Sequence, residues 1–130
     1  MKIRFPGGQR VDAEHRGLTI RTDQKEANGG ENSAPSPFDL FLASIGTCTG
    51  YYVLAFCQKR DIPTEEIGLT LDLVRDEERH RIRRIEIEVH LPESFPERYV
   101  DACLKSAAQC AVKKCLEDPP EIGLTAAGPS

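Results

Sequence analysis

The chain has 130 residues, of which 39% are hydrophobic and 29% charged. These proportions are those of an ordinary globular protein and exclude a disordered or fibrous chain, and the length suits one domain over residues 1–130. The net charge of −4 gives no electrostatic reason to expect nucleic-acid binding, since such proteins usually present a basic face, and it makes an acidic membrane surface an unexpected partner.

The first third of the chain has short alternating apolar runs separated by turn residues. The opening segment MKIRFPGGQR has no apolar stretch of the kind that a signal peptide carries, so export is not expected. Three runs place two apolar side chains on one face before each turn, and this predicts a small antiparallel meander. The pairs are Ile3 with Phe5, Val11 with Ala13, and Leu18 with Ile20. The segment QKEANGGENSAPSP, next in the chain, is predicted to be a loop because glycine and proline punctuate it.

A long apolar helix is predicted from Pro37 to Arg60, with Ser36 as its N-cap. The stretch is apolar on every side, so we expect protein to surround it, either in a core or at a subunit contact. Its middle contains small and hydroxyl residues such as Gly46, Thr47 and Gly50, which make a membrane span an unfavourable interpretation.

The second half predicts two strands and another helix, which makes the fold class α+β. LTLDLV (69–74) and RIEIEVHL (84–91) alternate as half-buried strands and are joined by the charged turn RDEERHR. Ser94 and Glu97 have capping-box spacing, and the helix that they begin is expected to run to Pro119. Its expected buried stripe consists of Val100, Cys103, Leu104, Ala107 and Ala111.

The five cysteines are an odd number and include no C-x-x-C pair, which favours reduced thiols in a cytoplasm over a disulfide scaffold. Cys48 and Cys57 are nine residues apart and project from opposite sides of the first helix, so they cannot pair with each other. Cys103 and Cys110 lie at nearly the same angle on the second helix, and either of them could meet Cys48. The usual zinc-ligand spacings and nucleotide or flavin motifs are absent, so we expect no metal and no cofactor.

Cys48 differs from the other cysteines in its neighbours. Most free cysteines behave as small buried hydrophobes, and this interpretation suits Cys57, Cys103 and Cys115. Cys48 instead lies among Gly46, Thr47, Thr49 and Gly50, which leave room and hydrogen-bonding capacity beside its sulfur. It is the candidate reactive thiol.

The segment PSPFDLFLASIGTCTGYYVLAFCQKRDIP resembles the conserved helix of the OsmC/Ohr family of thiol peroxidases. In that family a proline-led apolar helix carries a cysteine eleven residues after the proline, and Pro37 and Cys48 have this spacing. The Gly29-Gly30 loop fits the OsmC-like branch. The family's second hallmark, a cysteine followed by a small residue and a valine, is supplied by Cys110 in QCAVKK.

This resemblance implies an OsmC-like fold in which two chains form an intertwined homodimer, with antiparallel sheets wrapping two long central helices. It also implies that Cys48 attacks an organic hydroperoxide and becomes a sulfenic acid, and that Cys110 then forms a disulfide with it. An external dithiol, in this family a lipoylated protein or a small thiol, would reduce that disulfide.

A buried thiolate needs a compensating cation, because burial raises the pKa of a cysteine. The mid-helix position of Cys48 brings no help from a helix N-terminus, so we expect an arginine to approach it. Arg21 matches the position at which OsmC proteins carry their arginine, and Arg10 and Arg4 are alternatives. Asp39 takes the place of the family's glutamate, one position later, either orienting that arginine or favouring the helix dipole.

Four aromatic residues of the first helix are candidates for an apolar substrate pocket: Phe38, Phe41, Tyr51 and Tyr52. They are equally suited to core and interface packing. The sequence thus predicts a cytoplasmic hydroperoxide reductase. The alternatives are a non-catalytic binding protein of the same fold for a small apolar or thiol-bearing ligand, and a purely structural interaction module.

Overall fold

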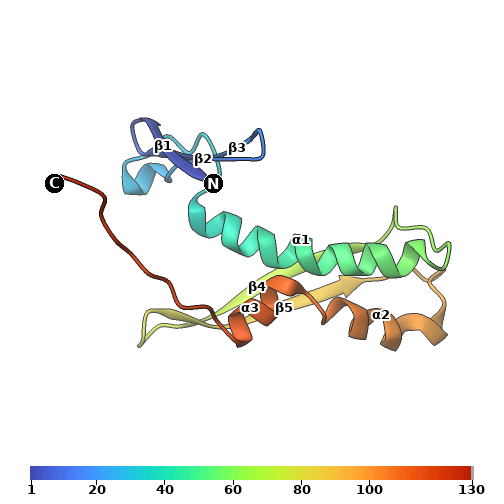
Figure 1. The fold of residues 1–130 in the computed structure, drawn as a ribbon. Helices are drawn as coiled ribbons and strands as arrows, with labels where there is room; N and C mark the ends of the chain where they lie inside the picture. The colour runs from blue at the N-terminus through green and yellow to red at the C-terminus, as the bar shows by residue number, and fades with distance from the viewer. Residues whose placement is uncertain (130) are drawn as a thin grey trace. The chain divides into compact units, whose positions relative to one another are not determined.

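The computed structural model describes residues 1–129. They divide into two compact units, Met1–Ser44 and Ile45–Ser130, and the division falls within the long helix α1 (Pro37–Gln58). Figure 1 shows the order of the elements along the chain. The α+β class is confirmed, whereas the assignment of residues 1–130 to one domain stays a prediction.

The first unit contains the predicted meander. Strands β1 (Lys2–Gly7), β2 (Arg10–His15) and β3 (Leu18–Thr22) form a three-stranded antiparallel sheet in the order β1-β2-β3. The register pairs Ile3 with Ala13 and Ala13 with Ile20, so apolar side chains share one face. That face is open, because Ile3 is 55% exposed and Phe5 82% exposed.

The loop after β3 is organised by one buried carboxylate. Asp23 accepts hydrogen bonds from the backbone N–H groups of Gln24, Glu31 and Ser33 and from the Ser33 hydroxyl. These bonds, of which the Ser33 hydroxyl bond contributes most, lower the Asp23 pKa from 3.8 to about 2. The loop also contains the 3₁₀ helix η1 (Glu26–Asn28).

The Gly29-Gly30 pair of this loop has a steric explanation. Gly29 has a φ of 85°, the left-handed conformation that favours glycine at the end of a helical turn. A Cβ at Gly30 would lie 2.0 Å from the carbonyl oxygen of Gln24, so any side chain there would force the backbone apart.

Helix α1 begins where the sequence predicted. The backbone N–H of Asp39 donates to the Ser36 hydroxyl (3.1 Å), and the Ser36 N–H donates to the Asp39 carboxylate (3.1 Å). This is a capping box, in which two otherwise unpaired N–H groups are satisfied reciprocally. By length and composition α1 could cross a membrane, a criterion that core helices of soluble proteins also meet.

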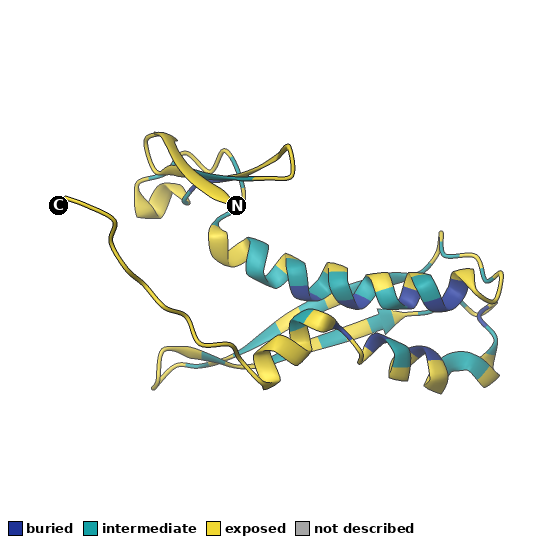
Figure 2. Cartoon of the chain, in the orientation of Figure 1, coloured by how far each residue is buried: buried dark blue, intermediate teal, exposed yellow. Residues whose placement is uncertain are grey.

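Only one stripe of α1 is buried, whereas the sequence predicted that protein would surround the helix on every side. Figure 2 shows this stripe in dark blue. The side chains recur at intervals that bring them to one face of the helix. They are Ile45, Thr49, Val53, Phe56 and Cys57.

The second unit is built on a two-stranded antiparallel hairpin, β4 (Gly68–Asp76) and β5 (Arg81–His90). The predicted alternation of β5 is confirmed: Ile85, Ile87 and Val89 are half-buried, and Glu86 and Glu88 are exposed. Gly46 and Gly50 of α1 face leucines of β4, and a Cβ at either glycine would make an ordinary van der Waals contact with a leucine methyl group.

The predicted second helix is wrong as a single element. The chain instead forms the 3₁₀ helix η2 (Glu97–Tyr99), α2 (Val100–Ala107) and α3 (Ala111–Glu117). The N-cap of η2 is Pro96, without a side-chain hydrogen bond, so the Ser94–Glu97 capping box does not begin it. Of the predicted stripe, Cys103 and Ala107 are buried. Leu104, within α2, and Ala111 are exposed. Ala111 lies beyond the break between α2 and α3, which interrupts the periodicity on which the stripe was based.

The core of the second unit lies where α1, α2 and the segment before α2 meet. Its buried residues are Val53, Phe56, Cys57, Phe95, Cys103 and Ala107. Partly buried apolar residues from the hairpin and from η2, among them Val89 and Tyr99, pack against them. Cys57 and Cys103 are members of this cluster, so thiols form part of the core itself.

A candidate thiol redox site

All five cysteines are free, and four of them form two neighbouring pairs between α1 and the α2–α3 region. Cys48 lies close enough to Cys110 to lower its pKa, and the thiols of Cys57 and Cys103 likewise influence each other's pKa. We call the first the cavity pair and the second the core pair. The periodicity of the sequence left open whether Cys103 or Cys110 meets Cys48, and the structure brings Cys110 to it.

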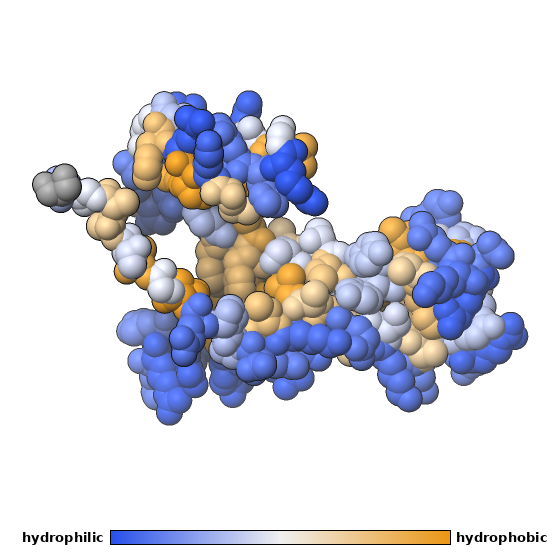
Figure 3. All heavy atoms as spheres, in the orientation of Figure 1, coloured by the Kyte–Doolittle hydropathy of each residue, from blue (hydrophilic) through white to orange (hydrophobic). Residues whose placement is uncertain are grey.

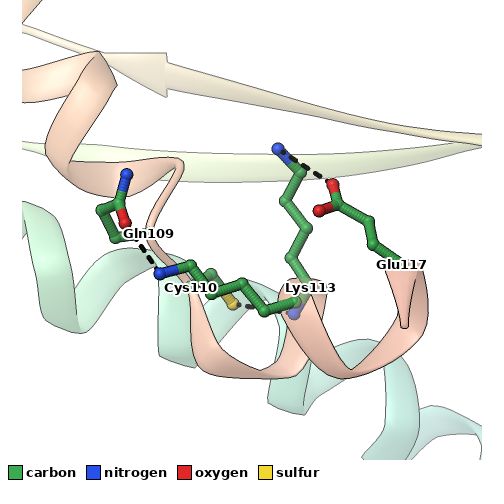
Figure 4. A network of polar contacts seen from close by, with 5 residues as sticks. Gln109, Cys110, Lys113 and Glu117 are labelled. Atoms are coloured by element: carbon green, nitrogen blue, oxygen red, sulfur yellow. Dashed lines mark hydrogen bonds and ion pairs between the residues drawn. The ribbon is translucent and has the colours of Figure 1, made fainter. Parts of the chain in front are cut away.

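The break between α2 and α3 positions Cys110. After α2 ends, the N–H groups of Gln109 and Cys110 bond to carbonyls three residues back, and Cys110 itself has extended angles (φ −45°, ψ 121°). Its sulfur accepts a hydrogen bond from the Lys113 N–H at 3.4 Å and so caps α3 (Figure 4). The sulfur also lies 4.0 Å from the carbonyl oxygen of Ile45 on α1.

The two pairs have opposite electrostatics. Burial is the largest single influence on Cys110 and raises its pKa, but hydrogen bonds with the Lys113 N–H and with the side chains of Cys48 and Thr49 together outweigh it, so the pKa is lowered. In the core pair, burial raises the pKa of both Cys57 and Cys103, and the nearby Arg60 only partly opposes this. A thiolate is therefore favoured at Cys110 and disfavoured at both cysteines of the core pair.

An apolar cavity of about 300 Å³ adjoins the cavity pair. Ile45 and Thr49 of α1, which contact Cys110, line one side of it. The other walls are formed by Ile85, Ile87 and Val89 of β5 and by residues of α2 and α3, including Lys113 and Leu116. Sequence reasoning missed this lining, although the alternation of β5 and the four-residue spacing of Ile45 and Thr49 both marked these faces as buried.

The predicted aromatic lining does not border this cavity. Tyr51 and Tyr52 make an edge-to-face contact with ring centroids 5.6 Å apart and border a different cavity of the second unit. Phe38 and Phe41 contact each other within the first unit, with ring centroids 5.4 Å apart. Their role in binding a substrate stays a prediction.

The candidate arginines and Asp39 all belong to the first unit. Arg21 is exposed on β3 opposite Asp12, Arg4 pairs with Glu14 at 2.7 Å, and Arg10 donates to the carbonyl of Gly7. Among residues 1–129, Asp39 has no ion pair with an arginine; hydrogen bonds from Ser36 lower its pKa, with a smaller contribution from Lys25. Asp39 thus serves the helix start, and its catalytic role and that of Arg21 stay predictions.

Comparison with known proteins decides the family. The model of the OsmC-like protein family matches residues 30–125. The chain belongs to the OsmC-like family. Its members have a peroxide-related redox role, which is consistent with the paired thiols. No curated protein matches the chain.

Solved structures share the fold at low identity. One is described as an osmotic stress induced and detoxification response protein of Psychrobacter arcticus, with 22% identity and a TM-score of 0.73 over 87% of this chain and 84% of that one. Another is the organic hydroperoxide resistance protein OsmC of Legionella pneumophila, with 18% identity and a TM-score of 0.53 over 88% and 85%. A third, OhrB of Bacillus subtilis, has 18% identity and a TM-score of 0.52 over 88% of each chain.

Proposed function

We propose that the protein reduces organic hydroperoxides to alcohols, with Cys48 as the peroxidatic cysteine and Cys110 as the resolving cysteine. The observation that carries this proposal is the proximity of these two thiols, one on α1 and one at the α2–α3 junction, which is close enough for Cys48 to lower the pKa of Cys110. A disulfide requires such proximity. The neighbouring apolar cavity suits an alkyl group, and the family membership supplies the peroxide chemistry.

The cycle has two steps on the enzyme. The Cys48 thiolate attacks the terminal oxygen of the hydroperoxide; a sulfur–oxygen bond forms, the oxygen–oxygen bond breaks, and the alcohol leaves after protonation. The Cys110 thiolate then attacks the sulfenic sulfur; a sulfur–sulfur bond forms, the sulfur–oxygen bond breaks, and the hydroxide leaves as water after protonation. An external dithiol, such as a lipoylated protein, returns both cysteines to thiols. The lowered pKa of Cys110 favours the second step, because the thiolate is the attacking species.

Arg21 and Asp39 complete the proposed site. An arginine beside Cys48 would stabilise its thiolate and the charge that develops on the departing oxygen. Among the four arginines of the meander, Arg21 is preferred on its match to the family position, and Asp39 would orient it. The aromatic side chains Phe38, Phe41, Tyr51 and Tyr52 are proposed to border the path of a bulky substrate.

We further propose that the active form is a homodimer in a reducing cytoplasm. The open apolar face of the meander supports a second copy as the covering surface. Sedimentation analysis tests this, with Ile3→Asp expected to shift the protein from dimer to monomer. An unchanged dimer would mean that the meander face is not the contact.

The catalytic proposal is tested by adding sub-stoichiometric cumene hydroperoxide to the reduced protein and mapping disulfides by mass spectrometry. Rapid formation of a Cys48–Cys110 disulfide is the expected result. Slow, indiscriminate oxidation of several cysteines would contradict it and favour a non-catalytic binding protein of the same fold.

A further inference from the structure

A second cavity, of about 620 Å³, lies between the C-terminal half of α1 and α2 and shares no lining residue with the cavity beside Cys110. We call it the basic pocket. Its side chains are of two main kinds, aromatic and cationic. They are Tyr51, Tyr52 and Phe56, and Lys59, Arg60 and Lys105.

The charge of the basic pocket opposes that of the whole protein. The chain has a net charge of −4, yet three cations and no carboxylate line this cavity. In the part of the chain that the structure describes, none of the four ion pairs involves Lys59, Arg60 or Lys105. Three cations without a carboxylate partner around one hollow attract an anion.

Arg60 is held in place before any ligand arrives. Its guanidinium carbon lies 3.6 Å from the centroid of the Phe56 ring and 5.4 Å from that of Tyr99, and its Nη1 donates to the Phe56 carbonyl at 3.1 Å. Arginine has five N–H donors, so this one bond leaves others for a ligand. A group already fixed by its neighbours loses little conformational entropy on binding.

Gln109 adds a donor at the edge of the pocket. Its side-chain oxygen accepts a hydrogen bond from the Lys114 ammonium at 2.7 Å (Figure 4), so its NH₂ group is the part left to bind a ligand. Together with the three cations, it gives the pocket a set of hydrogen-bond donors. Such a set recognises carboxylate, sulfonate or phosphate oxygens.

We propose that the basic pocket is a second ligand site, which binds a small aromatic anion. The ring of the ligand contacts Tyr51 and Tyr52, and its anionic group contacts Lys59, Lys105 and Arg60. The size of the cavity is within the range of small-molecule sites. This site is distinct from the cavity pair, because its lining includes neither Cys48 nor Cys110.

Phenyl phosphate is the test ligand, measured by isothermal titration calorimetry on the full chain. Lys59→Gln combined with Lys105→Gln is expected to weaken binding about tenfold or more, because it removes two of the three cations that line the pocket. The matched control is Lys2→Gln combined with Lys25→Gln, which removes the same charge from exposed positions of the first unit and is expected to leave the affinity unchanged. Both double variants replace exposed side chains, and urea unfolding verifies their stability.

Two further ligands separate charge from ring recognition. Inorganic phosphate and cyclohexyl phosphate are expected to bind more weakly than phenyl phosphate, because neither can stack on tyrosine. NMR signals of the Tyr51 and Tyr52 rings are expected to shift during the titration. No saturable binding of phenyl phosphate, equal affinity in the two double variants, or equal affinity for cyclohexyl phosphate would overturn the proposal.

Discussion

The cavity pair and the core pair both consist of cysteines, but their surroundings differ in how they affect the pKa of a thiol. In both, a cysteine of α1 lies near a cysteine of the α2–α3 region and influences its pKa. The core pair lies in the buried cluster, where desolvation raises the pKa of both thiols and outweighs the opposing effect of Arg60. Cys110 lies at a helix break, where the backbone N–H of Lys113 donates to its sulfur. Local backbone geometry, rather than burial alone, therefore separates the thiol with a lowered pKa from the two with raised pKa values.

The largest expected difference between the pairs is in catalysis. We expect Cys48→Ser or Cys110→Ser to lower organic hydroperoxide turnover by about three orders of magnitude, because removing a nucleophile removes the reaction path. Cys103→Ser should change turnover less than about twofold once stability is matched, since it touches no reacting atom. Stopped-flow consumption of cumene hydroperoxide measures both. Equal losses in Cys48→Ser and Cys103→Ser would remove the functional distinction.

Chemical labelling should separate the pairs next. With iodoacetamide at neutral pH, we expect the exposed Cys115 and the partly exposed Cys48 to react first. The core pair should react at least about a hundredfold more slowly, since it needs opening of the core. Mass spectrometry of peptides from timed aliquots gives each rate. Labelling of Cys57 as fast as Cys48 would show that the core pair is accessible.

Substitution should affect stability in the reverse order. We expect Cys57→Ser to lower the free energy of unfolding by about 1–3 kcal/mol, because it places a hydroxyl in the buried cluster. Cys48→Ser, at a partly exposed position, should cost less than about 1 kcal/mol. Urea unfolding followed by circular dichroism tests both values, with Cys115→Ser as the exposed control. A greater loss of unfolding free energy in Cys48→Ser than in Cys57→Ser would show that the cavity pair, and not the core pair, makes the stabilising contacts.

The smallest expected effect concerns pH. The lowered pKa of Cys110 makes its contribution to stability grow with rising pH and reach its full value above the ordinary pKa of 9.0. The raised pKa of Cys103 has the opposite sign, so stability is lost once the unfolded thiol ionises. Urea unfolding between pH 7 and about 10 should therefore show opposite changes of slope in Cys110→Ser and Cys103→Ser relative to the parent. Changes of the same sign would refute the electrostatic contrast.

Much of the fold can be predicted from local patterns in the sequence. The alternation of Ile85, Ile87 and Val89 correctly predicts β5, and Ser36 with the helix that it caps correctly predicts the start of α1. The break before Cys110 was missed because Ala108 and Gln109 are compatible with a helix and no glycine or proline marks the end of α2. Without knowledge of that break, the exposure of Ala111 could not be predicted.

The candidate site was predictable only in its cysteines. The helical angles show that Cys48 and Cys57 face different neighbours, but the choice between Cys103 and Cys110 depends on how far α2 extends along α1. Arg21 could not be placed from the pattern, because strand alternation assigns it to a face and not to a partner. Asp39 shows the same limit, since a carboxylate at this position suits a capping box as well as an arginine contact.

Apolar side chains on the outside of the first unit show why a single chain is an incomplete guide to burial. Figure 3 shows such residues at its surface, and Phe5 and Leu18 are among the exposed ones. The pattern of the strands predicted half-buried faces, and burial of these faces requires a covering surface beyond the sheet itself.

The buried Asp23 carboxylate makes the loop after β3 resistant to low pH. Its pKa of about 2 lies below the ordinary 3.8. The hydrogen bonds that hold the loop after β3 therefore contribute their full stability above pH 3.8, and this stability is lost only as the pH falls through about 2. At about pH 4, many surface carboxylates begin to take up protons, but the hydrogen bonds to Asp23 would remain intact. The loop should then be among the last parts of the first unit to loosen.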